Sequence, residues 1–191
     1  RLLEAPDPSD AMLAMEESGV LAAILPEASA GALPALVSAE QGEGLAPDPM
    51  QRLMALLPRR LREVREAGRI LRLSNAERDR LAAWADPALA HVGTLSPADL
   101  AEAFYRHGTE AVCDRALIEA ASGAGESLKL VLASAARWTR PAFPVGGEDA
   151  LAAGLSGPAV GNALAQAEEA WIASGFTLPR EALLARLSQP D

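Results

Sequence analysis

The sequence is poor in aromatic residues, cysteine and histidine. Aromatic residues make up 4% of its 191 residues, with one cysteine and two histidines. A single cysteine cannot form an internal disulfide, and two histidines without a paired ligand spacing argue against a structural zinc site. No apolar run approaches the roughly 18 residues of a membrane span, and the start lacks the basic-then-apolar order of a signal peptide. We therefore expect a cytoplasmic protein.

Strong helix formers supply most of the apolar side chains. Hydrophobic residues make up 50% of the chain, which argues against disorder. Most of them are alanine and leucine, whereas the β-branched residues that favour strands are scarce. The sequence therefore predicts an all-α fold, with a multi-helix body, a small helical tail subdomain and no significant sheet.

Helix start and stop signals follow one another along the chain. Ser74 and Glu77, for example, have the spacing of a capping box. The stretch "TRPAFPVGG" interrupts this series with two prolines and two glycines, which favours a boundary. We predict a helical body over residues 1–138, a linker over 139–147 and a helical tail over 148–191. The tail is too short to bury a core alone.

Arginine is concentrated in one window. The chain carries a net charge of -9, yet residues 59–80 hold eight arginines against four acidic residues, so this window is +4 and the remainder -13. Helical spacing places one arginine row, Arg62, Arg65, Arg69 and Arg72, on a single face of the predicted helix, which suits a phosphate backbone. The alternative is a solvated helix face with local Glu–Arg pairs. The candidate anion-binding arginines are Arg59, Arg62, Arg65, Arg69 and Arg72.

The glycine-rich stretch "GLSGPAVGNAL" lies in the predicted tail. Pro158 suits the first turn of a helix, and the free N–H groups of a helix start favour a phosphate. Gly157 and Gly161 are therefore further candidates, and we expect Gly161 to face a neighbouring helix. Neither a Gly-Lys-Ser/Thr sequence nor G-x-G-x-x-G is present, which argues against a nucleotide-binding loop.

The end of the same predicted helix has the pattern of a Schellman cap. We expect Gly175 to adopt a positive φ and Phe176 to pack against Trp171. Helix geometry alone, without a bound phosphate, therefore accounts for the glycines and the proline of this part of the tail.

No pattern of catalytic residues is present. The sequence has no nucleophile elbow, no neighbouring Cys–His pair and no D-x-D pair for magnesium. Cys113 is predicted to be a buried structural thiol, and His91 and His107 to lie at helix ends. The residues alone thus predict a non-catalytic helical module.

Two stretches resemble bacterial CCA-adding enzymes, the tRNA nucleotidyltransferases related to poly(A) polymerase. Residues 2–27, "LLEAPDPSDAMLAMEESGVLAAILPE", are similar to the family's "pdP..al..m...GvL..iLPE" segment. Residues 143–176, "FPVGGEDALAAGLSGPAVGNALAQAEEAWIASGF", are similar to its C-terminal "P..GeDl...Gl.GP.vG..L......W...gF" segment. The order of the two stretches and the helical region between them also agree, so the resemblance covers nearly the whole chain.

The resemblance implies that the chain is the tRNA-binding body and tail of such an enzyme. In that family a head with G-S and D-x-D holds Mg2+, and a neck with E-D-x-x-R selects CTP or ATP. Both would precede residue 2, so we expect a non-catalytic fragment whose partners are tRNA and its own N-terminal catalytic domain.

In that setting the arginine row and the two tail glycines become candidate contacts to the upper half of tRNA, although the arginine row belongs to no quoted family motif. The alternative is a protein-interaction or scaffold module without RNA binding.

Overall fold

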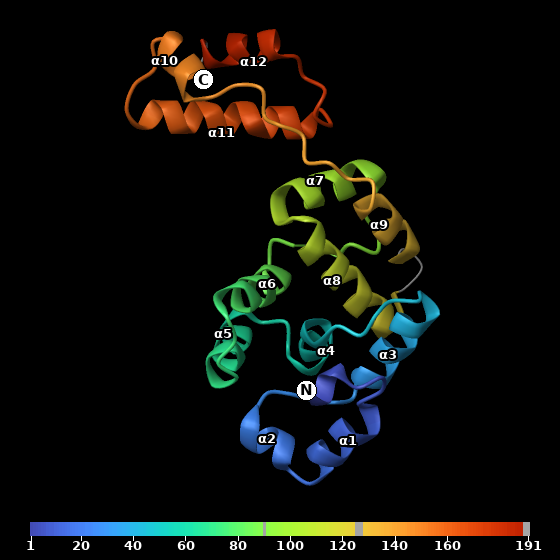
Figure 1. The fold of residues 1–191 in the computed structure, drawn as a ribbon. Helices are drawn as coiled ribbons and strands as arrows, with labels where there is room; N and C mark the ends of the chain where they lie inside the picture. The colour runs from blue at the N-terminus through green and yellow to red at the C-terminus, as the bar shows by residue number, and fades with distance from the viewer. Residues whose placement is uncertain (90, 125–127, 189–191) are drawn as a thin grey trace. The chain divides into compact units, whose positions relative to one another are not determined.

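The computed structural model describes residues 1–89, 91–124 and 128–188 of the chain (Figure 1). Within these residues the regular secondary structure consists of helices joined by short loops, without a strand. The all-α prediction is therefore confirmed. Its physical basis is the abundance of alanine and leucine, which lose little side-chain freedom in a helix.

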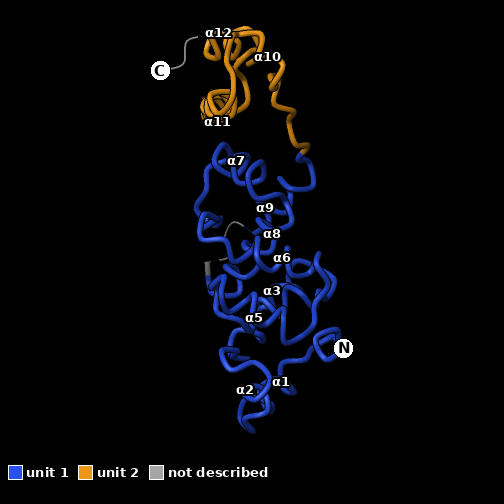
Figure 2. The backbone as a smooth tube through the Cα atoms, turned by 90° about the vertical axis from the view of Figure 1, so that its left-hand side faces the viewer, with its two compact units in different colours: residues 1–138 blue, residues 139–191 orange. Residues whose placement is uncertain are grey.

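The chain divides into two compact units, Arg1–Trp138 and Thr139–Asp191 (Figure 2). This division falls where the sequence changes composition, and residues 139–147 belong to the second unit. The first unit contains η1 (Leu2–Glu4), α1 (Ser9–Glu17), α2 (Val20–Ile24), α3 (Leu33–Gly42), α4 (Pro49–Leu56), α5 (Leu61–Ile70), α6 (Asn75–Ala85), α7 (Pro97–His107), α8 (Thr109–Glu119), η2 (Ala120–Ala124) and α9 (Leu128–Ala135). The second unit contains α10 (Gly147–Ala152), α11 (Pro158–Ala173) and α12 (Arg180–Leu187).

The first unit has two buried apolar clusters. One joins α3, α7, α8 and α9 around side chains such as Leu33, Phe104 and Val112. The other joins α4, α5 and α6 around Met54 and Trp84, which are each 1% exposed. Each large apolar side chain buried in this way contributes about 1.5–3 kcal/mol. The second cluster holds α5 and α6 against the body and so positions the arginine-rich window.

A buried arginine fixes the start of the chain. Arg52 is 1% exposed, and its Nη2 lies 2.8 Å from Glu40 Oε2 on α3. The same guanidinium donates hydrogen bonds to the carbonyl oxygens of Leu3, Ala5 and Pro6. Arg52 thereby ties the segment around η1 to α3 and α4, because a buried charge requires a full set of partners.

Helix α5 is shorter than the apolar spacing suggested. In the sequence, apolar residues recur at steps of four, three, four and three, which predicts one helix face made of Leu57, Leu61, Val64, Gly68 and Leu71. The helix spans Leu61–Ile70 instead, and Leu71 is 37% exposed. The buried face consists of Val64, Ala67 and Gly68. A Cβ on Gly68 would lie 3.0 Å from Cγ of Arg78 on α6, so glycine permits this close approach of α5 and α6. The following turn contains the predicted Ser74–Glu77 capping box.

The tail was expected to be too short to bury a core alone, but its three helices pack around the buried side chain of Trp171. This side chain is 3% exposed, and its ring centroid lies 5.4 Å from that of Phe143 and 5.0 Å from that of Phe176. Helix α11 ends in the predicted Schellman turn. Gly175 has a φ of 67°, its N–H donates to Ile172 O, and the N–H of Phe176 donates to Trp171 O. Both predictions about this turn are confirmed.

Candidate nucleic-acid interface

The eight arginines of the window divide into structural and exposed groups. Arg59 was predicted to be an anion-binding residue, but its guanidinium is half-buried against the end of α6. Nε donates to Trp84 O at 2.9 Å, and Nη2 donates to Leu89 O at 2.6 Å and to Asp86 O. Burial also lowers the pKa of Arg59. Its donors are committed to carbonyl groups of the fold, so it does not belong to an exposed row.

Arg80 is also a structural residue. Its Nε and Nη2 each lie 2.8 Å from a carboxylate oxygen of Asp114, and Nη2 lies 2.6 Å from Oδ2 of Asp48. Gln51 donates a further hydrogen bond of 2.9 Å to Asp114. The hydrogen bonds to Asp114 raise the pKa of Arg80 further above its ordinary value. This network joins the start of α4 to α6 and α8.

Two other arginines form ion pairs at the surface. Arg60 lies 3.3 Å from Glu27 and 3.7 Å from Glu63, and Arg69 lies 2.6 Å from Glu66. The hydrogen bond from Arg69 lowers the pKa of Glu66. Ion pairs of exposed arginines contribute little to stability, so an incoming phosphate can compete for these guanidinium groups.

Arg62, Arg65 and Arg72 remain exposed and unpaired. Their guanidinium groups make no ion pair or hydrogen bond with the residues that the structure describes. Arg62 and Arg65 lie one turn apart on α5, and Arg69 continues the same face. These side chains form the free part of the arginine row.

The structure places Arg72 outside the helix, in contrast to the prediction. It has a φ of 53° and occupies the left-handed position of a Schellman turn that ends α5. The N–H of Arg72 donates to Arg69 O at 3.2 Å, and the N–H of Leu73 donates to Gly68 O at 3.0 Å. The row is therefore three helical arginines followed by one on the turn.

The two candidate glycines of the tail lie at the start of α11. Gly157 precedes the helix with a φ of 58°, and Pro158 is the first helical residue. Gly161 was expected to face a neighbouring helix. It is instead exposed, and a Cβ added to it would meet no atom within 4 Å. The predicted helix is present, but no neighbouring helix covers the side of α11 that carries Gly161.

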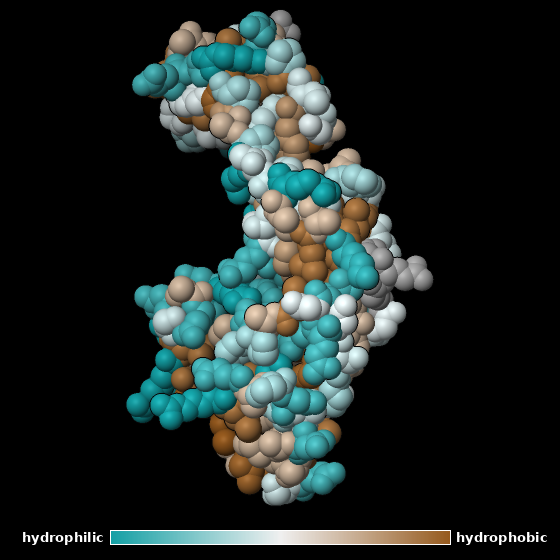
Figure 3. Space-filling view, turned by 45° about the vertical axis from the view of Figure 1, so that its right-hand side comes forward, coloured by the Kyte–Doolittle hydropathy of each residue, from teal (hydrophilic) through white to brown (hydrophobic). Residues whose placement is uncertain are grey.

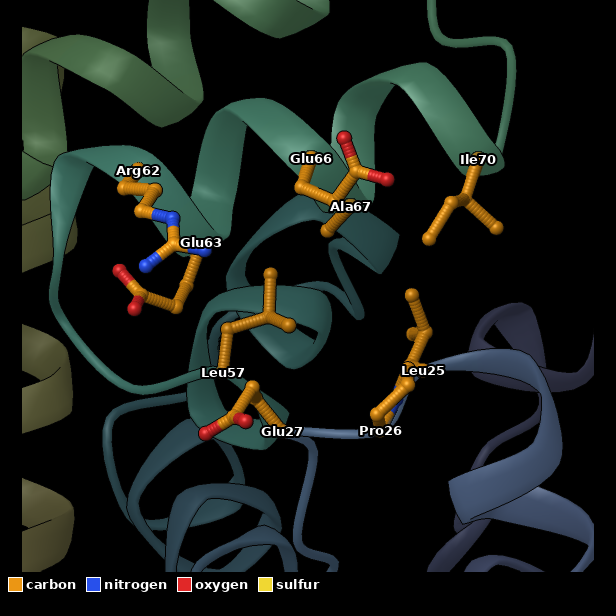
Figure 4. A pocket seen from close by; sticks show the side chains of 9 residues that line it. All are labelled: Leu25, Pro26, Glu27, Leu57, Arg62, Glu63, Glu66, Ala67 and Ile70. Carbon is orange, nitrogen blue, oxygen red and sulfur yellow. The ribbon is translucent and has the colours of Figure 1, made fainter.

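A groove lies directly beside the arginine row. It has a volume of about 260 Å³ and runs between α5 and the segment that follows α2 (Figure 4). Arg62, Glu63 and Glu27 lie at one end, where the two glutamates come from opposite walls. The side chains that line the groove are Leu25, Pro26, Glu27, Leu57, Arg62, Glu63, Glu66, Ala67 and Ile70.

Hydrophilic and hydrophobic side chains separate on the visible face of the first unit. Figure 3 shows hydrophilic side chains gathered over the α5–α6 region and hydrophobic side chains over α1 and α2. The exposed large hydrophobic side chains of η1 and α2 are Leu2, Val20 and Ile24, which are 41%, 45% and 43% exposed. Leu2 and Ile24 border an open apolar groove of about 450 Å³ that also reaches Leu71.

His91 and Cys113 lie in structural environments. Nδ1 of His91 lies 2.9 Å from Glu119, whose other oxygen accepts hydrogen bonds from the N–H groups of Val92 and Gly93. Burial raises the pKa of the Cys113 thiol to about 11, as expected for a structural thiol. In the described part of the chain, no group of three or more His, Cys, Asp or Glu residues is arranged to hold a metal ion.

Sequence reasoning missed the buried charges Arg52 and Asp114 and the structural role of Arg80. A local signal exists for Asp114, which interrupts an otherwise apolar face of α8 and is 1% exposed. A charged residue at a core position indicates a buried partner. The partner itself lies 34 positions away and cannot be read from local spacing.

No protein-family model matches the sequence. The chain is similar to the "Uncharacterized 28 kDa protein in petA 5'region" of Rhodospirillum rubrum, with 42% identity over 66 residues. This match covers 29% of the chain and 26% of that relative, about a quarter of the relative's length. None of the described helices is both long and apolar enough to span a bilayer.

Proposed function

We propose that this chain is the C-terminal, tRNA-binding part of a CCA-adding tRNA nucleotidyltransferase. In this proposal it holds the RNA, while a catalytic head and neck earlier in the same polypeptide bind Mg2+ with CTP or ATP. The chain itself transfers no nucleotide. The resemblance of residues 2–27 and 143–176 to that family supports the proposal, as does the all-α architecture of the region between them.

One observation carries the RNA-binding part of the proposal: three arginines of α5 and the turn that follows it are exposed and unpaired. Arg62, Arg65 and Arg72 lie in a window of net charge +4 within a chain of net charge -9. The other arginines of that window make ion pairs or hydrogen bonds within the fold. Unpaired guanidinium groups bind phosphate without first breaking an internal contact, and such binding depends on charge rather than on base sequence.

The acidic remainder of the chain limits the strength of this binding. Exposed charges more than about 10 Å apart are largely screened at 0.1 M salt, so the arginine row attracts RNA only at close range. At lower salt the net negative charge of the chain also acts, and it opposes the approach of RNA. We therefore expect weak, strongly salt-dependent binding by this chain.

The test measures tRNA binding by the 191-residue chain as a function of salt. A triple variant replaces Arg62, Arg65 and Arg72 by Ala. Each phosphate contact contributes about 0.7–0.9 to the slope of log affinity against log salt, so the variant should flatten the slope by roughly two to three units. The matched control replaces three other exposed arginines and changes the net charge equally: Arg1, Arg137 and Arg186. Equal slopes for the two folded variants would contradict the proposal.

The exposed apolar surface over α1 and α2 favours a second candidate, a protein-interaction module without RNA binding. Leu2 and Ile24, which are 41% and 43% exposed, line the open groove of about 450 Å³, and Val20 on α2 is 45% exposed. Large exposed apolar patches mark interaction surfaces in many proteins. Under this alternative the chain has no specific RNA site, so the Arg62/Arg65/Arg72 replacements would leave the affinity for tRNA at low salt unchanged.

A further inference from the structure

We propose that the groove between α5 and residues 25–27 binds one unstacked nucleobase of an RNA strand whose phosphates lie on Arg62 and Arg65. This inference rests on the proposed function, because it requires that RNA reaches the arginine row. It adds a site that contacts a base, whereas the row itself contacts only the backbone.

The size and the floor of the groove suit a single base. Its volume of about 260 Å³ lies just below the roughly 300 Å³ at which pockets for drug-sized ligands begin. Leu25, Leu57, Ala67 and Ile70 supply an apolar surface, which a nucleobase requires for its two faces. Because these side chains are aliphatic rather than aromatic, the contact is weaker than stacking on an aromatic ring.

The polar end of the groove suits the edge of a base. Carboxylates of Glu27 and Glu63 come from opposite walls (Figure 4). Arg60 lies 3.3 Å from the first and 3.7 Å from the second. Glu63 is 15% exposed, so its carboxylate is largely shielded from solvent. Carboxylates accept hydrogen bonds from the exocyclic amino group of cytosine.

The charge balance favours a neutral group inside the groove. Three glutamates line it, and Arg62 together with the ion-pair partners Arg60 and Arg69 balances them. A phosphate inside the groove would meet three carboxylates. A base is neutral, and Arg62 stands at the end of the groove where the sugar-phosphate backbone would leave it. Sequence-specific recognition of RNA uses unstacked bases in this way.

The test compares two short RNAs that differ chiefly in the group at position 4 of the base. Hexamers of cytidylate and of uridylate carry the same phosphate charge, but only cytosine offers an amino group to the carboxylates. We expect the cytidylate hexamer to bind the chain about fivefold more tightly in fluorescence anisotropy at low salt. The readout is this affinity ratio, because general changes in phosphate binding affect both hexamers equally.

Two variants locate the preference in the groove. Glu63→Gln replaces the carboxylate by an amide of similar size, and Ala67→Leu fills the floor. Each should reduce the ratio toward one. The matched control is Glu102→Gln, which removes an exposed carboxylate paired with Arg106 on α7, and it should leave the ratio unchanged. If Ala67→Leu does not fold by circular dichroism, Glu63→Gln decides the question alone.

The outcomes separate this inference from the proposed function. Equal affinities for the two hexamers, or a preference that survives in folded Glu63→Gln, would overturn the base site. The proposed function would still stand if the arginine variant changed the salt slope. Absence of RNA binding at low salt would overturn both. Binding of an oligolysine peptide that Glu63→Gln abolishes, without any base preference, would assign the groove to a basic protein segment instead and overturn the base site.

Discussion

The guanidinium of Arg80 and the carboxylate of Asp114 face each other in a bidentate pair, with both N–O distances at 2.8 Å. Asp114 is 1% exposed and Arg80 is 18% exposed. The pair connects α6 to α8, and Asp48 at the start of α4 adds a third element. An arginine within the most basic window of the chain is therefore part of the internal framework.

Removal of one partner of this pair should destabilise the protein strongly. Asp114→Ala leaves the guanidinium of Arg80 without its main partner, so the free energy of unfolding should fall by about 3 kcal/mol. Urea denaturation followed by circular dichroism measures this change. Glu110→Ala is a matched control, because Glu110 lies 3.4 Å from the same guanidinium but is 67% exposed. Its effect should stay below about 1 kcal/mol. Similar losses of unfolding free energy in both variants would show that the Arg80–Asp114 pair contributes no more than the exposed contact to Glu110.

The arginine window shows what local spacing predicts and what it does not. The sequence was sufficient to predict the helical class, the Ser74–Glu77 capping box and the Schellman turn at Gly175, because each depends on residues a few positions apart. The role of an arginine depends instead on distant partners. Arg59 binds carbonyl groups as far as Leu89, and Arg80 binds Asp114, so helical periodicity alone could not separate them from Arg62 and Arg65.

Arg72 occupies a backbone conformation that glycine adopts more readily. Its φ of 53° costs an L-residue roughly 1–2 kcal/mol, whereas glycine loses about 0.5–1 kcal/mol more chain entropy on folding. Arg72→Gly should therefore raise the free energy of unfolding by about 0.5–1 kcal/mol in urea denaturation. Arg65→Gly removes the same side chain from the helix interior and should lower that free energy by about 1 kcal/mol. The prediction is wrong if both glycine variants are destabilised.

Two glycines of α11 and its C-terminal turn should respond oppositely to alanine. Gly175 has a φ of 67°, so Gly175→Ala should destabilise the tail by about 1 kcal/mol. Gly161 lies in the exposed part of the helix with no atom within 4 Å of an added Cβ, so Gly161→Ala should stabilise it by about 0.5–1 kcal/mol. Thermal melting by circular dichroism measures both changes. Destabilisation by Gly161→Ala would indicate that this face is covered by an unidentified contact.

The groove beside α5 also lay beyond the reach of the sequence. Its walls come from residues 25–27, Leu57 and α5, which the chain brings together only by folding. The apolar spacing of α5 even suggested that Leu71 is part of the buried face, whereas it is 37% exposed. A spacing rule identifies the residues on one face of a helix. Which part of that face is covered depends on where the helix ends and on the elements that pack against it.

The stability of the tail should depend on the ionisation of Asp149. Its carboxylate accepts a hydrogen bond of 2.8 Å from the N–H of Gly146 and two more from Arg180, one of them 3.1 Å long. These contacts, the Gly146 N–H first, lower the pKa of Asp149 below its ordinary value of 3.8. A carboxyl group with a lowered folded-state pKa stabilises the fold above its unfolded-state pKa. That contribution is lost as the pH falls through the folded-state pKa.

Asp149→Asn tests this dependence. Its melting temperature should lie below that of the unaltered chain by the same amount at pH 7 and pH 5, where Asp149 is ionised in both states. The difference should shrink below about pH 4 and disappear in more acidic solution, because protonation then removes the same contribution from the unaltered chain. Glu148→Gln is the control, since Glu148 is an exposed neighbour in the first turn of α10. A difference that persists unchanged at the lowest pH would assign the role of Asp149 to hydrogen bonds that its neutral form also makes.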